Sequence, residues 1–297
     1  MNNQKSAFVA IVGRPNAGKS SVMNRLLGQK VVIVSDKPQT TRTRIMGVLT
    51  EGDSQYVFVD TPGFHKPRSL LGQSMVKAVS DGMSDVEGCM LVVDCTKKPS
   101  DIETELCSKL LSKRQPAILV INKIDLLKDK SDLLSVIAAY NVLYDFAAVV
   151  PVSAKNGDGF EALKSEIDRF SEPGFHMFDD DTLTDQPERV LAAELIREKL
   201  LRLLDKEIPH GIAVVIERFK DRENSDILDI DATIYCEKDS HKGIIIGKGG
   251  QTLKRVASLA RADMENFFGC KINLQCWVKV REGWRNRQAA IHNFGLD

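Results

Sequence analysis

The chain has 297 residues, of which 43% are hydrophobic and 28% are charged, and its 41 Lys and Arg residues balance 41 Asp and Glu residues. This composition is typical of a soluble globular protein, and the length is sufficient for two ordinary domains. No stretch approaches the roughly 18 to 20 continuous apolar residues that a membrane span needs, and the first residues lack the basic and apolar runs of a signal peptide. The six cysteines show no CxxC pair or metal-ligand spacing, so we expect reduced thiols and a cytoplasmic protein.

Acidic and basic residues are unevenly distributed along the chain. Residues 172–188 include six acidic residues and no Lys or Arg, whereas residues 240–297 include ten Lys and Arg against four Asp and Glu. Two prolines and an Asp-Asp-Asp run in the acidic stretch are typical of a boundary between domains. We therefore expect an N-terminal domain over residues 1–173, a linker over 174–188 and a C-terminal domain over 189–297.

Short apolar runs recur in the N-terminal domain and alternate with longer helical patterns. Each run is rich in β-branched residues and ends in a polar residue or a glycine, which is typical of strands buried on both faces of a parallel sheet. We therefore expect a doubly wound α/β domain that binds its ligand beyond the carboxyl ends of the strands. The runs are FVAIVG, YVFVD, CMLVVD, AILVIN and AAVVPVSA.

The sequence GRPNAGKS, residues 13–20, follows the first of these runs and precedes a helical pattern. Its form, GxxxxGK[ST], is that of a phosphate-binding P-loop, in which backbone N–H groups face the phosphates, Lys19 adds a positive charge, and the Ser20 hydroxyl is offered to Mg²⁺. The alternative, a chance glycine turn, does not explain why a strand, the loop and a helix follow in this order. The residues expected to bind the phosphates are Gly13, Asn16, Ala17, Gly18, Lys19, Ser20 and Ser21.

Three further motifs fall at the ends of later runs. DTPG begins at Asp60 and places a carboxylate near the metal and the N–H of Gly63 near a γ-phosphate. NKID ends in Asp125, whose carboxylate can accept hydrogen bonds from the ring N–H and the amine of guanine, a pattern that adenine does not supply. The backbone of SAK can meet the guanine carbonyl oxygen, so the series predicts GTP as the nucleotide. The residues expected at the base are Asn122, Lys123, Asp125, Ser153, Ala154 and Lys155.

This series of motifs resembles that of the translation-factor-related small GTPases, which bind Mg²⁺ and GTP. The resemblance implies a threonine that ligates Mg²⁺ only when the γ-phosphate is present. In the sequence QTTRTR the match is Thr41, with Thr40 as the alternative. The implied metal ligands are Ser20, Thr41 and Asp60, and the implied catalytic residues are Asn16, Lys19, Thr41 and Gly63.

One position departs from the family pattern. Many relatives carry a glutamine directly after the DxxG glycine to orient the attacking water, whereas Phe64 follows Gly63 here, and a phenyl ring cannot make that hydrogen bond. Asn16 resembles the asparagine that helps to hold a potassium ion (K⁺) beside the phosphates in GTPases that lack the glutamine. Such an ion would supply positive charge to the reaction. The alternative is that Asn16 is only a turn residue.

The C-terminal domain contains a second glycine-rich loop, Gly247 to Gly250, in a different setting. The order of patterns is helix, strand, strand, helix, glycine loop, helix, strand, so the loop joins two helices, whereas a dinucleotide-binding loop would follow a strand. This order resembles an α+β KH domain of type II, whose GxxG loop receives the backbone of single-stranded nucleic acid. The alternative is a tight turn between two helices. The residues expected to contact RNA are Gly247, Lys248, Gly249, Gly250, Lys242, Lys254 and Arg255.

A GTPase domain followed by a KH domain resembles the Era family of bacterial GTPases over the whole chain. The resemblance implies a GTP-hydrolysing switch that binds small-subunit ribosomal RNA near its 3′ end and assists assembly of the small ribosomal subunit, and we expect a monomer. Trp284, Arg285 and Arg287 would lie beside the RNA groove or, alternatively, serve packing and solubility. Two other interpretations stay open: an RNA-binding assembly chaperone in which hydrolysis is incidental, and a signalling GTPase attached peripherally to the inner face of the cell membrane.

Overall fold

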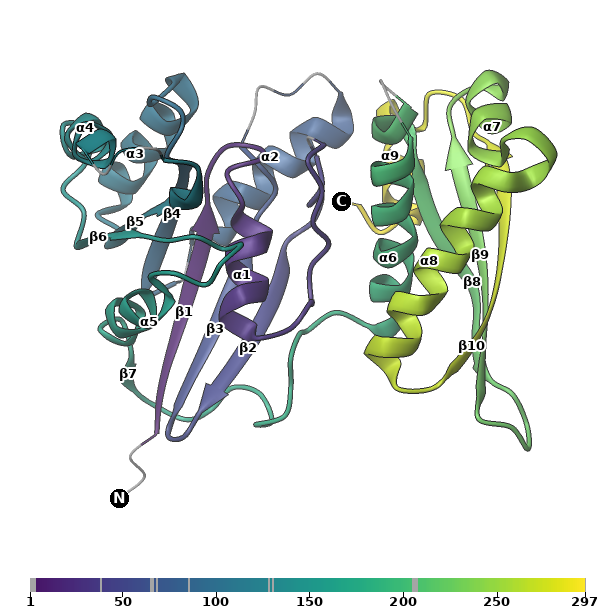
Figure 1. Cartoon of the computed structure of the whole chain (residues 1–297), viewed down its shortest axis with the longest axis horizontal. Helices are drawn as coiled ribbons and strands as arrows, with labels where there is room; N and C mark the ends of the chain where they lie inside the picture. Colours follow the sequence, from purple (N-terminus) through teal and green to yellow (C-terminus); the bar gives the residue numbers. More distant parts are fainter. Residues whose placement is uncertain are drawn as a thin grey trace. The chain divides into compact units, whose positions relative to one another are not determined.

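The computed structural model describes residues 4–37, 39–64, 67, 69–84, 86–127, 129, 131–204 and 208–296. The chain divides into two compact units (Figure 1). The N-terminal unit comprises Met1–Val32, Thr41–Pro67 and Met75–Asp185, and the C-terminal unit comprises Ile33–Thr40, Arg68–Ser74 and Gln186–Asp297. Across the part of the chain that the structure describes, no helix combines the length and the apolar character that crossing a membrane would require.

The N-terminal unit is built on a sheet in the order β2-β3-β1-β4-β5-β6, with β7 paired to β1. The strands β3, β1, β4, β5 and β6 are parallel and correspond to the five predicted apolar runs. The prediction of a doubly wound α/β domain is confirmed. The strands are β1 (Lys5–Val12), β2 (Ile45–Glu51), β3 (Ser54–Asp60), β4 (Gly88–Asp94), β5 (Ala117–Asn122), β6 (Ala148–Pro151) and β7 (Glu172–Pro173).

Two apolar cores, one on each face of this sheet, explain the β-branched runs. Side chains of α1 and α5 pack into one core, and side chains of α2, α3 and α4 pack into the other. Strands that are covered on both faces have no side facing solvent, so apolar and polar residues do not alternate along their sequences. The helices are α1 (Lys19–Leu27), α2 (Leu70–Gly82), α3 (Asp101–Lys113), α4 (Ser131–Asn141) and α5 (Phe160–Asp168), with a short 3-10 turn at η1 (Ile124–Leu126).

The strand β2 was not predicted from the sequence. It pairs antiparallel to β3 at the edge of the sheet, and only its first half is well buried. An edge strand with a polar end lacks the continuous apolar run by which its neighbours were recognised.

The acidic segment that follows β7 lies along the edge of the same sheet. The side chain of Gln55 accepts hydrogen bonds from Met177 N at 2.8 Å and Phe178 N at 3.0 Å. Thr184 Oγ1 donates to Met46 O at 2.6 Å. Part of the segment that was expected to be a linker, between Met177 and Asp185, is therefore hydrogen-bonded to β2 and β3 of the N-terminal unit.

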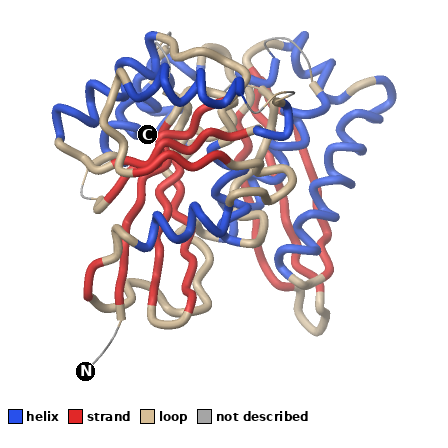
Figure 2. Tube along the Cα trace, turned by 60° about the vertical axis from the view of Figure 1, so that its left-hand side comes forward, coloured by secondary structure: helices blue, strands red, loops and turns tan. Residues whose placement is uncertain are grey.

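The C-terminal unit packs helices against a three-stranded sheet in the order β10-β9-β8. Figure 2 shows the strands of both units in red and the helices in blue. The pair β9 and β10 is parallel and the pair β8 and β9 is antiparallel, which matches the predicted order of elements. The elements are α6 (Glu188–Leu203), η2 (Ile208–Gly211), β8 (Ala213–Asp221), β9 (Ile227–Cys236), α7 (Asp239–Ile246), η3 (Lys248–Gly250), α8 (Gln251–Phe268), β10 (Lys271–Val280), η4 (Trp284–Asn286) and α9 (Gln288–Asn293).

The glycine loop between α7 and α8 requires glycine at its first position. Gly247 has φ 73°, and a Cβ atom there would lie 2.2 Å from Thr252 Oγ1. A Cβ atom at Gly249 or Gly250 would meet no atom within 4 Å. The loop therefore turns tightly at Gly247 and leaves an open surface beyond it.

Trp284 belongs to the core of the C-terminal unit. Its side chain is 0% exposed, Nε1 donates to Gly211 O at 2.9 Å, and the ring meets Phe294 edge-on at 5.2 Å between centroids. Arg285, the next residue, pairs with Glu237 at 2.5 Å. For Trp284 the structure therefore favours the packing alternative over direct contact with RNA.

Burial of the indole predicts a large stability effect. We expect Trp284→Ala to lower the free energy of unfolding of the C-terminal unit by about 3 to 5 kcal/mol, because a large cavity and an unpaired carbonyl remain. Trp277→Ala is the matched control, since that side chain is 46% exposed, and we expect it to cost less than about 1 kcal/mol. Urea unfolding followed by circular dichroism measures both. Equal effects would contradict the assignment of Trp284 to the core.

Candidate functional site

The P-loop connects the end of β1 to the start of α1. Gly18, the residue directly before α1, has φ 97°, and a Cβ atom there would lie 2.2 Å from Asn122 Nδ2. The hydrogen-bond ladder of α1 begins where Val22 N–H donates to Gly18 O at 2.9 Å. The N–H groups of Lys19, Ser20 and Ser21 precede that bond, and free N–H groups at a helix N-terminus attract anions.

Lys19 places its ammonium group inside this loop. Its Nζ donates to Gly13 O and to Arg14 O, both at 3.2 Å. Burial lowers the pKa of Lys19, and the nearby Asp60 carboxylate only partly opposes this effect. A buried ammonium that donates to two carbonyl oxygens gains from a strongly anionic ligand, which the phosphates would provide.

Three oxygen-bearing side chains meet beside the loop. Ser20 Oγ lies 2.9 Å from Asp60 Oδ2 and 3.1 Å from Thr41 Oγ1, and Thr41 Oγ1 lies 3.1 Å from the same carboxylate oxygen. Asp60 is 0% exposed, and its Oδ1 has no hydrogen-bond partner among the described residues. Burial raises the pKa of Asp60, against the lowering effects of Lys19, Ser20 and Thr41.

These oxygens fit a small divalent cation. Mg²⁺ prefers carboxylate and hydroxyl oxygens, and in nucleotide sites it is bound through one or two carboxylates together with phosphate oxygens and water. Within the described part of the chain, no three His, Cys, Asp or Glu side chains come together as a metal site. The protein therefore supplies part of a coordination shell that a phosphate ligand would complete.

The two candidate threonines lie in different surroundings. Thr41 is 5% exposed and belongs to the cluster with Ser20 and Asp60. Thr40 Oγ1 donates to Lys37 O at 2.7 Å, away from that cluster. The geometry therefore favours Thr41 as the threonine that faces the metal.

Asn122 joins the P-loop to the loop that follows β6. Its Nδ2 donates to Ala17 O at 3.0 Å, and its Oδ1 accepts from Ala154 N at 3.1 Å. Lys123 donates to Asn16 O at 2.8 Å. The phosphate residues and the expected base residues therefore form one connected site at the carboxyl edge of the sheet.

Asp125 lies where its carboxylate can accept hydrogen bonds from a nucleotide base. Its Oδ1 accepts a hydrogen bond of 2.6 Å from Ser153 Oγ, which fixes the direction of the carboxylate. Ser153 is buried, Asp125 is half-buried, and the Lys155 side chain is exposed at the rim. The carboxylate of Asp125 can accept further hydrogen bonds from the N–H donors of a planar ring.

Sequence reasoning missed Asp94 as a member of this site. Lys123 pairs with Asp94 Oδ2 at 2.7 Å, and Asp94 also accepts from Thr96 Oγ1 at 2.6 Å. Burial alone would raise the pKa of Asp94, but the hydrogen bonds from Lys123 and Thr96 outweigh it and hold the pKa below its usual range. The signal was present, because the apolar run of β4 ends in this aspartate at the same edge of the sheet.

Phe64 occupies the position where many GTPases carry glutamine. It is 5% exposed, packs in the core, and has the Lys109 ammonium 4.0 Å from its ring centroid. Its backbone N–H donates to Gly13 O at 3.2 Å, which ties the residue after Gly63 to the P-loop. The Phe64 ring serves packing, so any orientation of water must come from other groups.

The second glycine loop presents basic side chains. Lys248, Lys254 and Arg255 are exposed, and Lys242 is half-buried. Lys248 and Gly249 lie at the turn, and Lys254 and Arg255 lie in the first two turns of α8. Basic groups beside an open glycine turn fit a polyanionic backbone.

Comparison with known proteins identifies two families along the chain. The family described as "50S ribosome-binding GTPase" matches residues 8–123, and the KH domain family matches residues 207–285. GTPase Era from Clostridioides difficile is 51% identical over 293 residues, which cover 99% of each chain. GTPase Era from Ruminiclostridium cellulolyticum is 44% identical over 291 residues, which cover 98% of this chain and 97% of the relative.

Two solved structures are similar over the same length. One is a variant of Era from Aquifex aeolicus bound to GDP and AlF₄⁻, and the other is Era in complex with MgGDPNP and nucleotides 1506–1542 of 16S ribosomal RNA. Each is 36% identical, has a TM-score of 0.95, and matches 99% of both chains.

The position of Asp125 predicts the base preference. We expect Asp125→Asn to weaken GTP binding by at least ~100-fold, about 3 kcal/mol, because an amide presents N–H donors to the N–H donors of guanine. Xanthosine triphosphate, which offers an acceptor there, should become the preferred nucleotide. Asp158→Asn, an exposed change in the neighbouring loop, is the control. Unchanged GTP affinity in a calorimetric titration of Asp125→Asn would rule out the assignment.

Proposed function

Because the chain belongs to the Era family of GTPases, we propose that it is a GTP-hydrolysing switch that binds small-subunit ribosomal RNA near its 3′ end and assists assembly of that subunit. The observation that carries this proposal is that Asn122 joins the phosphate residues to the base residues at one sheet edge. The match of residues 207–285 to the KH domain family supports the RNA-binding part of the proposal.

The residues of the N-terminal unit have separate tasks in the proposed reaction. Lys19 and the N–H groups that begin α1 bind and orient the phosphates, and Asp125 binds the base. Ser20, Thr41 and Asp60 would hold Mg²⁺, which supplies positive charge to the phosphate oxygens when bound. The N–H of Gly63 would sense the γ-phosphate, so loss of that phosphate would release the loop that begins at Asp60.

The RNA partner is inferred from the similarity over the full chain. The description of the GTPase family names the 50S subunit, but that match ends at residue 123. The Era structure that contains 16S ribosomal RNA covers 99% of this chain, including the KH domain. This similarity favours a small-subunit RNA as the ligand of the glycine loop. We propose a monomeric cytoplasmic protein because its proposed RNA partner is cytoplasmic, with peripheral attachment to the membrane as the alternative.

Turnover measurements with and without small ribosomal subunits test the proposed function. We expect the isolated protein to hydrolyse GTP and the subunits to change its rate. A protein that binds GTP and RNA without turnover in either condition would instead be a nucleotide-regulated RNA chaperone.

Asn16 is the candidate for holding a monovalent cation. Its backbone has φ 63°, a conformation that disfavours alanine, so Asn16→Gly removes the side chain without backbone strain. If Asn16 helps to hold K⁺, GTP turnover by the natural protein should be faster in potassium than in sodium at equal ionic strength, and Asn16→Gly should abolish the difference. Equal rates of the natural protein in both salts would leave Asn16 as a turn residue.

The glycine loop predicts a selective effect on RNA. Lys248→Asp with Gly249→Asp should lower RNA affinity by at least ~100-fold, about 3 kcal/mol, because the carboxylates repel phosphates. GTP affinity should stay the same. Fluorescence anisotropy with nucleotides 1506–1542 of 16S RNA at two salt concentrations measures the change, with circular dichroism as the folding check.

A matched control for this double variant exists in the same unit. Lys220→Asp with Asn224→Asp changes the net charge by the same amount, and both residues are exposed. Asn224 has φ 58°, close to the 57° of Gly249. If the control and the loop variant lower RNA affinity equally, the loop is only a turn.

A further inference from the structure

The second residue of the P-loop, Arg14, pairs with a carboxylate of helix α3. Its Nε lies 3.1 Å from Oε1 of Glu103, and the two side chains are 13% and 0% exposed. Both residues belong to the N-terminal unit. The nucleotide-binding motifs assign no task to either side chain, so the purpose of this contact has to be inferred from its surroundings.

The ion pair is largely shielded from solvent but is incompletely hydrogen-bonded. Arg14 Nη2, Glu103 Oε1 and the Tyr140 hydroxyl are buried without a hydrogen-bond partner among the described residues. Burial, and after it the Glu103 carboxylate, raises the pKa of Tyr140, so this phenol of α4 lies within electrostatic reach of the pair. A buried ion pair is seldom more stable than apolar side chains of the same volume. The stability of the fold alone therefore does not explain why the pair is present.

The other carboxylate oxygen of Glu103 binds the start of α3. Oε2 accepts from Ser100 N at 3.0 Å and also from Ser100 Oγ. These contacts belong to a capping box, in which Ser100 Oγ accepts from Ile102 N at 3.3 Å. The backbone of α3 therefore fixes the direction in which Glu103 presents Oε1 to Arg14.

The backbone of Arg14 contacts the lysine of the P-loop. Its carbonyl oxygen accepts from Lys19 Nζ at 3.2 Å and from Ala17 N at 3.4 Å. In a P-loop this ammonium is the group that reaches the β- and γ-phosphates. Arg14 therefore contacts Glu103 through its side chain and Lys19 through its carbonyl, and it connects α3 to the phosphate-binding group.

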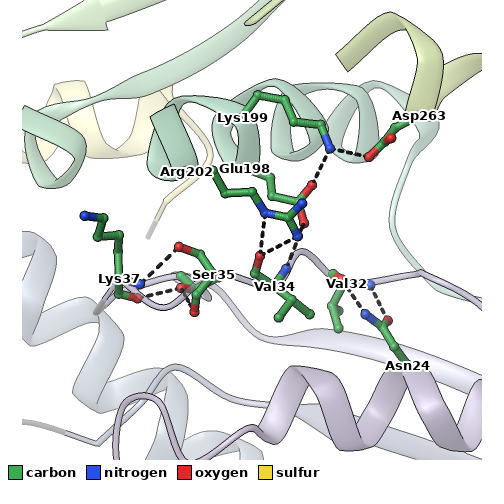
Figure 3. Close-up of polar contacts among 10 residues, drawn as sticks. Asn24, Val32, Val34, Ser35, Lys37, Glu198, Lys199, Arg202 and Asp263 are labelled. Carbon is green, nitrogen blue, oxygen red and sulfur yellow. Dashed lines mark hydrogen bonds and ion pairs between the residues drawn. The ribbon is translucent and has the colours of Figure 1, made fainter. Parts of the chain in front are cut away.

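Other parts of the loop and of α1 have separate anchors. Asn122 Nδ2 donates to Ala17 O at 3.0 Å. Further along α1, Asn24 Nδ2 donates to Val32 O at 2.7 Å (Figure 3). Neither contact involves Arg14. Removal of the link to α3 should therefore disturb the start of the P-loop and leave the base end of the site and α1 in place.

We propose that Glu103 is a positioning residue for the nucleotide phosphates, which acts through Arg14 to fix the carbonyl oxygen that holds Lys19. This inference rests on the proposed GTPase function. A site that is ordered in advance binds its ligand more tightly, because less freedom is lost on binding. Loss of the pair should weaken GTP and GDP alike, since Lys19 approaches phosphates in both nucleotides.

A double-mutant cycle on the full chain tests the proposal. Glu103→Gln keeps the shape of the side chain and an oxygen for the cap, but it turns an amide NH₂ group toward the Arg14 guanidinium. Arg14→Met removes the guanidinium and keeps a long side chain, and the double variant leaves no unpaired charge. Calorimetric titration with GDP and with GDPNP, both with Mg²⁺, gives the affinities, and thermal melting checks folding.

We expect each single variant to bind both nucleotides about 10-fold more weakly, and the double variant to show the same loss, because the two residues act through one contact. Independent effects would multiply to a loss of about 100-fold in the double variant and would overturn the proposal. Natural affinity in the folded variants would also overturn it. If a single variant does not fold, the double variant is compared with the natural protein, and equal affinities overturn the proposal.

Two control variants separate positioning from general stability. Leu110→Val alters a buried side chain of α3, and Glu166→Gln breaks another Arg–Glu pair, with Arg169 at 2.8 Å. We expect both controls to keep natural nucleotide affinity. A loss in Leu110→Val as large as that in Glu103→Gln would show that destabilised α3 is the cause and would overturn the proposal. If the natural protein binds neither nucleotide, the proposed function fails together with this inference.

Discussion

The side chain of Asn122 connects the loops that form the nucleotide site. Its amide nitrogen and oxygen bind backbone groups of Ala17 and Ala154, and the residue is 2% exposed. A buried amide left without such partners would cost about 1 to 3 kcal/mol, so both loops are strongly held to the end of β5. The position of Asn122 also explains why residue 18 is glycine, because the Asn122 side chain leaves no room for a Cβ atom there. The phosphate end and the base end of the site are therefore placed relative to each other before any ligand binds.

Two buried side chains of the nucleotide site, Lys19 and Asp60, are only partly stabilised in their charged forms by the protein itself. Burial lowers the pKa of Lys19 and raises the pKa of Asp60, so in both residues it disfavours the charged form. A phosphate chain with a divalent cation supplies the missing opposite charge to each. Groups that are fixed in advance around a developing charge need little rearrangement during a reaction, which is how enzymes obtain much of their electrostatic stabilisation. The same groups that reduce the stability of the empty site therefore favour its ligand.

The two glycine loops show how one residue type serves two ligands. In the N-terminal unit the loop joins a strand to a helix, and it encloses the phosphates of one nucleotide among the first N–H groups of α1. In the C-terminal unit the loop joins two helices, and the space beyond Gly249 and Gly250 is open. An open turn with exposed basic side chains can follow a long polyanion, whereas an enclosed loop can accept only a short one. The elements on either side of each loop decide which ligand fits.

The local features of this protein could be predicted from its sequence. The P-loop, the three later motifs and the order of elements in the KH domain were readable because each depends on neighbouring residues: a strand end, a glycine turn, or the period of a helix. Tertiary structure decided the features that depend on distant residues. The edge strand β2, the burial of Trp284 and the pairing of Asp94 with Lys123 belong to this group. The physical reason is that Asp94 and Lys123, or Trp284 and Gly211, meet only after the chain has folded, and no local pattern records which surfaces will then be covered.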